Sequence, residues 1–107
     1  MNANTRPRRL TMKRPGAIPT VQIDNERVKV TEWRFPPGGE TGWHRHGMDY
    51  VVVPMTTGPL LLETPEGSIT SQLTRGISYT RPEGVEHNVI NPSDTEFVFV
   101  EIEIKAA

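Results

Sequence analysis

The sequence contains no cysteine among its 107 residues. Disulfide bonds and thiolate metal ligands are therefore excluded. The chain also has no apolar run long enough to span a membrane, and its N-terminus lacks the apolar segment that secretion signals contain. We therefore expect a cytoplasmic protein with no membrane partner.

No stretch of the sequence shows the apolar period of an amphipathic helix. Short apolar or alternating runs are instead separated by turn signals that are rich in proline and glycine. The predicted strands cover residues 21–23, 27–35, 42–46, 49–53, 60–63, 69–73, 77–80, 85–90 and 97–104. So many short strands at regular spacing predict an all-β fold, a small antiparallel sandwich or barrel whose interior is the natural place for a ligand.

The predicted strand 27–35 changes its apolar phase part-way along. Val28 and Val30 alternate in one phase, whereas Trp33 and Phe35 alternate in the other. Because successive residues of a strand point to opposite faces, this change predicts a β-bulge or a strong bend within the strand.

The last predicted strand carries two glutamates on the same face as two phenylalanines. Phe97, Phe99, Glu101 and Glu103 share that face, and the other face is entirely aliphatic. If the phenylalanine face lines the interior, burial would raise the pKa of a glutamate there, and Glu101 becomes a candidate general acid or base. If the face points outward, both glutamates are solvated charges.

The first 20 residues carry five basic side chains and no acidic one, whereas the rest of the chain has 7 basic and 13 acidic residues. Prolines interrupt any helix in this basic arm, and no aromatic residue is available there for base stacking. We therefore expect no nucleic-acid partner. Residues 1–18 are interpreted as an arm that is either a solvated tail or a strand that crosses to a second subunit.

The three histidines of the chain fall in two segments. His44 and His46 are separated by one residue, so that on a strand both would point to the same face, and His87 lies in another predicted strand. Three imidazole nitrogens from two strands would make a metal site with coordination positions left open for water or substrate. Any one of these histidines alone would more simply be a polar strand residue.

The segments around the histidines resemble the two motifs of the cupin family. The first motif, G-x5-H-x-H, is matched by Gly38, His44 and His46, and the second, G-x5-P-x-G-x2-H-x3-N, by Gly76, Pro82, Gly84, His87 and Asn91. The resemblance implies a single jelly-roll barrel, or double-stranded β-helix, over residues 19–107, with His44, His46 and His87 as ligands of one divalent metal ion. The wording GWHRHGMDYVVVP with GVEHNVIN is also similar to small single-domain bacterial cupins associated with β-alanine degradation.

One position departs from the family pattern. The first motif usually continues, after three or four further residues, to a glutamate that serves as a fourth ligand, and here those places hold Tyr50 and Val51. Asp49 lies one residue early, so it should point out of the barrel while Tyr50 points in. Tyr50 could coordinate as phenolate, bond a metal-bound water, or simply pack. We therefore expect a three-histidine site.

These features suggest two classes of function. The first is a small metal-dependent enzyme that acts on a polar organic acid or carbonyl compound, by dioxygenase or by acid/base lyase or isomerase chemistry, with Tyr50 and Glu101 as candidate catalytic residues. The second is a non-catalytic metal or metabolite binding module. Three neutral imidazoles leave the metal charge uncompensated and so favour an anionic ligand.

The sequence leaves several details of this site and its assembly open. The metal could be iron, manganese, nickel or zinc. Arg34, Arg75 and Arg81 are equal candidates to hold a substrate carboxylate. A homodimer is expected from the small size of the chain and from the resemblance.

Overall fold

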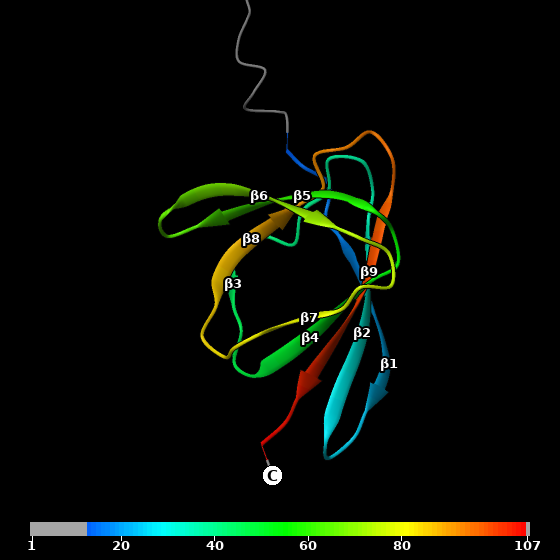
Figure 1. Cartoon of the computed structure of the whole chain (residues 1–107), viewed down its shortest axis with the longest axis vertical. Coiled ribbons are helices and arrows are strands. Elements are labelled where there is room, and N and C mark those ends of the chain that lie inside the picture. The colour runs from blue at the N-terminus through cyan, green and yellow to red at the C-terminus, as the bar shows by residue number, and fades with distance from the viewer. Residues whose placement is uncertain (1–12, 107) are drawn as a thin grey trace, which may run out of the picture.

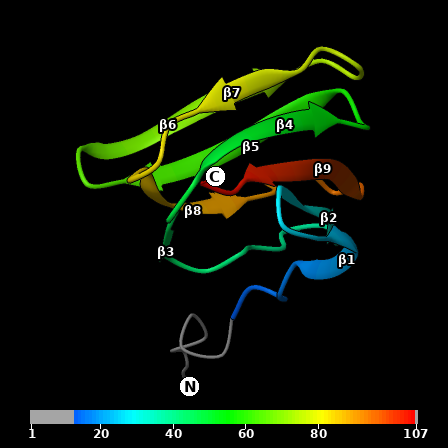
Figure 2. The same cartoon turned by 90° about the horizontal axis from the view of Figure 1, so that it is seen from below.

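The structure is a computed structural model that describes residues 13–106. The strands are β1 (Ile18–Asp24), β2 (Val28–Phe35), β3 (His44–Arg45), β4 (Asp49–Pro54), β5 (Gly58–Thr64), β6 (Gly67–Leu73), β7 (Tyr79–Arg81), β8 (Glu86–Ile90) and β9 (Phe97–Ile104). They form one sheet in the order β1-β2-β9-β4-β7 and a second in the order β3-β8-β5-β6, with every strand pair antiparallel. Figure 1 looks between the two sheets, and Figure 2 shows β1 and β7 at opposite edges of the first. The predicted all-β, jelly-roll fold is confirmed.

The core fills the space between the two sheets and extends to the histidines. It consists of the buried side chains of Phe35, Tyr50, Val52, Leu60, Leu73, Val89, Phe97 and Phe99. These residues come from both sheets, and the two-residue alternation of each strand points their side chains inward. On β9 the phenylalanines are buried and the aliphatic face is only half-buried, so the face that carries Glu101 is the inner one.

The predicted irregularity lies in β1 and not in β2, so that prediction was wrong. β2 pairs with β9 in unbroken register from Val28 to Phe35, whereas the pairing of β1 with β2 shifts between Val21 and Ile23. The two apolar phases of β2 occupy its two faces. Val28 and Val30 lie opposite aliphatic residues of β9 on the outer face, so no bulge is needed to bury them inside.

The turn before β8 holds the two histidine strands next to each other. Gly84 has φ of 98° and precedes β8, a left-handed conformation that side chains other than glycine rarely adopt. Its amide donates to the carbonyl of His46 at 2.8 Å, and the amide of His46 donates to the carbonyl of Val85 at 2.9 Å. These reciprocal bonds hold the chain after β3 against the start of β8.

Asn91 fixes the end of β8. Its side chain is fully buried and donates to the carbonyls of Thr95 at 2.8 Å, Pro36 at 3.2 Å and Phe35 at 3.4 Å, and its Oδ1 accepts from the amide of Ser93 at 3.0 Å. The asparagine of the second motif therefore ties two loops together and lies away from the histidines.

The described part of the N-terminal arm lies along the loop that precedes β3. The amide of Ala17 donates to the carbonyl of Glu40 at 2.8 Å, and Arg14 forms an ion pair with the same residue at 3.2 Å. Residues 1–12, which carry most of the predicted basic arm, lie outside the described residues. Over residues 13–106 there is no helix of the length and apolarity that a membrane span requires.

Candidate metal centre

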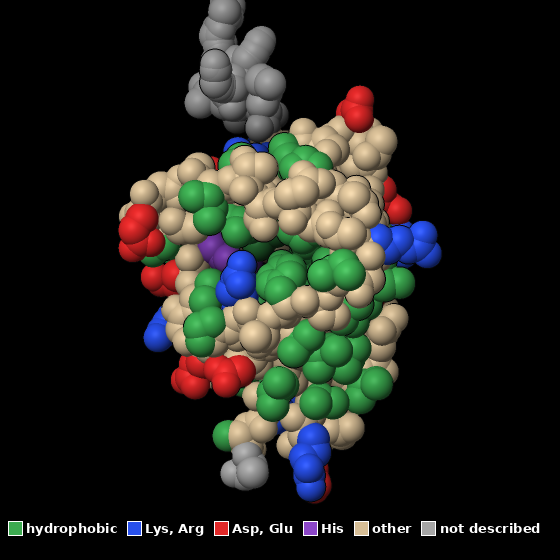
Figure 3. Space-filling view, viewed as in Figure 1, with side chains coloured by type: hydrophobic (Ala, Val, Ile, Leu, Met, Phe, Trp, Pro, Cys, Tyr) green, Lys and Arg blue, Asp and Glu red, His purple; other side chains and the backbone are tan. Residues whose placement is uncertain are grey.

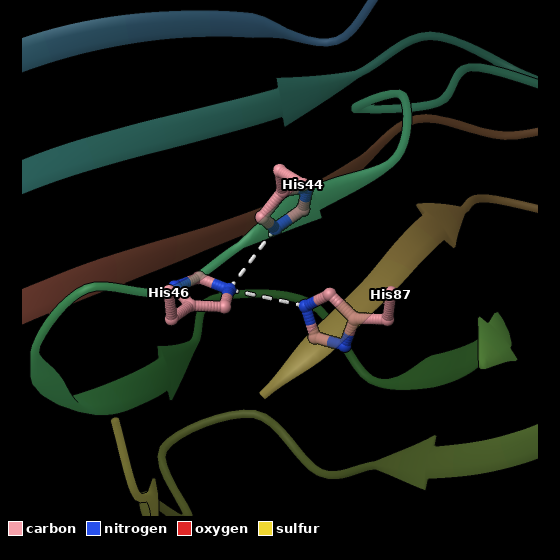
Figure 4. Close-up of side chains that lie close together, drawn as sticks. All are labelled: His44, His46 and His87. Carbon is pink, nitrogen blue, oxygen red and sulfur yellow. Dashed lines mark hydrogen bonds between the residues drawn. The ribbon is translucent and has the colours of Figure 1, made fainter. Parts of the chain in front are cut away.

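The three histidines meet at one point between the two sheets. β3 pairs with β8 so that His44 lies directly opposite His87, and His46 follows β3 immediately. The Nε2 atom of His46 lies 3.0 Å from Nε2 of His44 and 3.1 Å from Nε2 of His87 (Figure 4). His46 and His87 are buried, and His44 is half-buried at the opening of the site.

The spacing of these nitrogens suits a transition metal. Imidazole nitrogens bind such ions at about 2.0–2.1 Å, so two nitrogens on adjacent octahedral positions are about 3 Å apart. Both measured separations match that value. The set could hold three coordination positions of such an ion and leave the others for water or substrate oxygen.

The surroundings of His46 and His87 favour the neutral form that a ligand requires, and a hydrogen bond orients His44. Nδ1 of His44 lies 2.8 Å from the carbonyl of Gly42, and since a carbonyl only accepts, Nδ1 carries the proton and Nε2 is free to coordinate. Burial, reinforced by the neighbouring histidines, lowers the pKa of His46 to about 4. Burial, with His44 and Arg81 adding to it, lowers the pKa of His87 to about 4.

A polar network holds the loop whose Gly42 carbonyl contacts Nδ1 of His44. The amide of Gly42 donates to Oδ1 of Asn88 at 2.9 Å, and Nδ2 of Asn88 donates to Glu40 at 2.8 Å and to Glu63 at 3.0 Å. These residues were not predicted as part of the site. Asn88 follows His87 directly, and only the pairing of β8 with its neighbours shows that its side chain turns toward the loop that carries Gly42.

As predicted, the side chain of Tyr50 points into the barrel and that of Asp49 points out. Tyr50 is 2 % exposed and stacks on His46 with ring centroids 3.9 Å apart, whereas Asp49 is exposed and accepts from the amide of Glu83. Burial raises the pKa of Tyr50 above its ordinary value, which favours the phenol over the phenolate. Its hydroxyl has no hydrogen-bond partner within residues 13–106.

Glu101 lies on the far side of His46. Its Oε2 is 3.9 Å from Nδ1 of His46, and its Oε1 accepts from the indole of Trp33 at 3.4 Å. Burial and the neighbouring Glu103 raise the pKa of Glu101 to about 7, against the opposing effect of Trp33. His46, Glu101 and Glu103 also bring their ligand atoms within 4.8 Å of one another. The interpretation in which Glu101 and Glu103 face the interior is the one that the structure supports.

The histidines open onto a cavity of about 410 Å³, a size that suits a small organic molecule. Its walls are largely aliphatic and aromatic, and Lys29, Arg45, Arg81, Glu101 and Glu103 supply its charges. Figure 3 shows a histidine in a hollow on this face, with a cationic side chain and hydrophobic side chains around it.

The structure separates the three candidate arginines. Arg81 lines the cavity, whereas Arg34 is engaged by Glu96 at 2.7 Å and Glu32 at 3.3 Å. Arg75 is exposed and not among the residues that line the cavity. Tyr79, which was not predicted as a site residue, also lines the cavity. The two-residue spacing of Tyr79 and Arg81 on one strand was the signal that could have found it.

Comparison with known proteins agrees with this arrangement. The family described as "Cupin domain" matches residues 31–103, which is more than half of the chain. The chain belongs to the cupin family. Beta-alanine degradation protein BauB of Pseudomonas aeruginosa is 67 % identical to this cupin over 92 residues, which are 86 % of this chain and 97 % of BauB.

Solved structures show the same fold. This cupin superposes on the crystal structure of a cupin domain from Bordetella pertussis Tohama I with a TM-score of 0.88 and 97 % identity, covering 89 % of this chain and 99 % of that one. An uncharacterized conserved protein with a double-stranded beta-helix domain from Klebsiella pneumoniae matches with a TM-score of 0.70 and 22 % identity, covering 83 % and 76 % of the two chains. The second match bears on the fold alone.

Proposed function

We propose that this cupin is a metal-dependent enzyme that acts on a small organic acid or carbonyl compound. The observation that carries the proposal is the convergence of three imidazole Nε2 atoms, 3.0 and 3.1 Å apart, at the wall of a cavity large enough for such a molecule. A divalent ion of iron, manganese, nickel or zinc held by His44, His46 and His87 would act as a Lewis acid on a substrate oxygen. With iron, the same open positions suit dioxygenase chemistry.

The protein supplies the remaining chemistry from its own side chains. Glu101 lies in the cavity beside His46, where its Oε2 can accept or return a proton. The indole of Trp33 holds the other carboxylate oxygen and so orients the group. The aliphatic and aromatic walls lower the local dielectric, which strengthens the polar interactions in the cavity.

We further propose that the reaction belongs to the degradation of β-alanine. This proposal is supported by the name of the Pseudomonas aeruginosa relative and by an identity of 67 % that extends over 97 % of that protein. The substrate would then be a three-carbon acid or a carbonyl compound derived from one. The cavity volume is ample for such a molecule.

Metal content is the first test. Tag-free parent, His87→Ala and the exposed control Arg75→Ala would be loaded with iron, manganese, nickel or zinc and examined by elemental analysis. We expect near-stoichiometric metal in the parent and the control and a large loss in His87→Ala. Failure of the parent to retain any of the four metals would overturn the proposal.

Turnover separates an enzyme from a binding module. The metal-loaded parent and Glu101→Gln would be incubated with three-carbon oxo and hydroxy acids, with oxygen uptake recorded for the iron form. We expect turnover in the parent and a rate lowered by about 10²–10⁴-fold in Glu101→Gln, while the metal content stays the same. Saturable binding of these acids without turnover would indicate the non-catalytic module instead.

A further inference from the structure

Arg81 is the cavity residue best placed to receive an anion. It is paired directly with Tyr50 across β4 and β7, so both side chains leave the sheet on the same face. Its guanidinium carbon lies 4.8 Å from the centre of the Tyr79 ring, and Nη1 donates to the carbonyl of Thr80 at 3.3 Å. These two contacts restrict the side chain, while its other N–H groups remain available.

The other cations near the site are less suited to this task. No ion pair in residues 13–106 includes Arg81, Arg45 or Lys29. Lys29, however, lies directly opposite Glu103 in the register of β2 and β9, on the inner face. Arg45, which is exposed as Arg81 is, packs near Gly84. The planar guanidinium of Arg81 matches the geometry of a carboxylate.

Tyr50 supplies a second, independent indication. Tyr50 is only 2 % exposed, and it lines the same cavity. Its hydroxyl has no hydrogen-bond partner in the described residues. A buried hydroxyl without a partner costs stability, so such a group is expected to be retained where a ligand satisfies it. Tyr50 also lies directly opposite Arg81 in the register of β4 and β7.

We propose that Arg81 and the Tyr50 hydroxyl together hold the carboxylate of a short hydroxy or oxo acid whose second oxygen faces the three histidines. The inference rests on the proposed function and names its substrate class. The guanidinium fixes one end of the molecule, the aliphatic wall formed by residues such as Val52 and Leu60 contacts its carbon chain, and the histidine end receives the hydroxyl or carbonyl oxygen. Neutral compounds and acids without the second oxygen bind more weakly.

Binding of defined probes tests this assignment. The zinc-loaded protein would be titrated calorimetrically with 3-hydroxypropanoate, with the uncharged 3-hydroxypropanamide and with propanoate, which lacks the second oxygen. The variants are Arg81→Gln, Tyr50→Phe, the double variant and the exposed control Arg75→Gln. Zinc affinity would be measured separately for each protein.

We expect 3-hydroxypropanoate to bind the parent best. Arg81→Gln should weaken it by about 10-fold or more through loss of a charge-assisted pair, and Tyr50→Phe by about 3–10-fold, with unchanged zinc affinity. The amide should be insensitive to Arg81→Gln. Because both groups bind the same carboxylate, the double variant should lose less than the product of the single losses.

The assignment would be overturned by equal affinity of the parent and Arg81→Gln for the acid, by equal affinity of the parent for the acid and the amide, or by no binding of any probe. If Arg75→Gln lost as much affinity for the acid as Arg81→Gln, the effect would reflect the net charge of the protein and not a contact of Arg81, which would also overturn the assignment. Failure to bind zinc would be a failure of the proposed function. In that case the acid-over-amide preference of the metal-free protein still reports on Arg81.

Discussion

Replacing Tyr50 with phenylalanine should stabilise the metal-free protein. The tyrosine ring is 2 % exposed and stacks on His46, and phenylalanine keeps both the burial and the stacking. Folding strips water from the hydroxyl without providing a partner in the described residues. An unsatisfied buried polar group costs about 1–3 kcal/mol, so the free energy of unfolding should rise by about 1–2 kcal/mol.

Chemical and thermal denaturation in the presence of a metal chelator would measure this change. For a domain of this size, each kcal/mol corresponds to about 4–8 °C in the melting temperature. Tyr79→Phe is a matched control, because Tyr79 is only half-buried and its hydroxyl is absent from the group of buried, unpartnered atoms. We expect a change near zero for this control. A loss of stability in Tyr50→Phe would refute the reasoning and show that the hydroxyl has a stabilising partner.

Further predictions concern the support of the fold and its assembly. Asn91→Ala should lower the free energy of unfolding by about 2–4 kcal/mol, because it leaves buried carbonyls unpaired. The exposed turn variant Asn25→Ala should cost about 1 kcal/mol or less, and an equal loss in both would contradict the argument. The aliphatic outer face of β9 should be covered by a second copy of the chain. Light scattering should therefore show a dimer for the parent and a monomer for Ile102→Lys, whereas Ile69→Lys on β6 should leave the dimer intact; a monomeric parent would disprove the expectation.

Much of the candidate site follows from local pattern. The two-residue spacing of His44 and His46 places both rings on one side of the chain, and the same alternation turns Tyr50 inward and Asp49 outward. The strand boundaries agree with the apolar runs to within a few residues, because proline and glycine punctuate nearly every turn. The inner position of Glu101 was one of two alternatives that the pattern of β9 allowed.

Tertiary structure decided what depends on pairing between distant strands. The register of β3 and β8 sets His44 opposite His87, and the register of β4 and β7 sets Tyr50 opposite Arg81. No local pattern distinguishes Arg81 from Arg34, because each is an arginine on a strand. Only the ion pairs of Arg34 and the cavity around Arg81 do so.

The bulge was misplaced for the same reason. The sequence of β2 shows two apolar phases, but only the partner strands reveal that both of its faces meet apolar residues. The alternation of side chains is a property of each strand alone, and so the sequence by itself determined the strands, the inward histidines and the family motifs. The choice of neighbour is a property of the whole sheet, and so the structure alone decided which charges and hydroxyls share the cavity with the histidines.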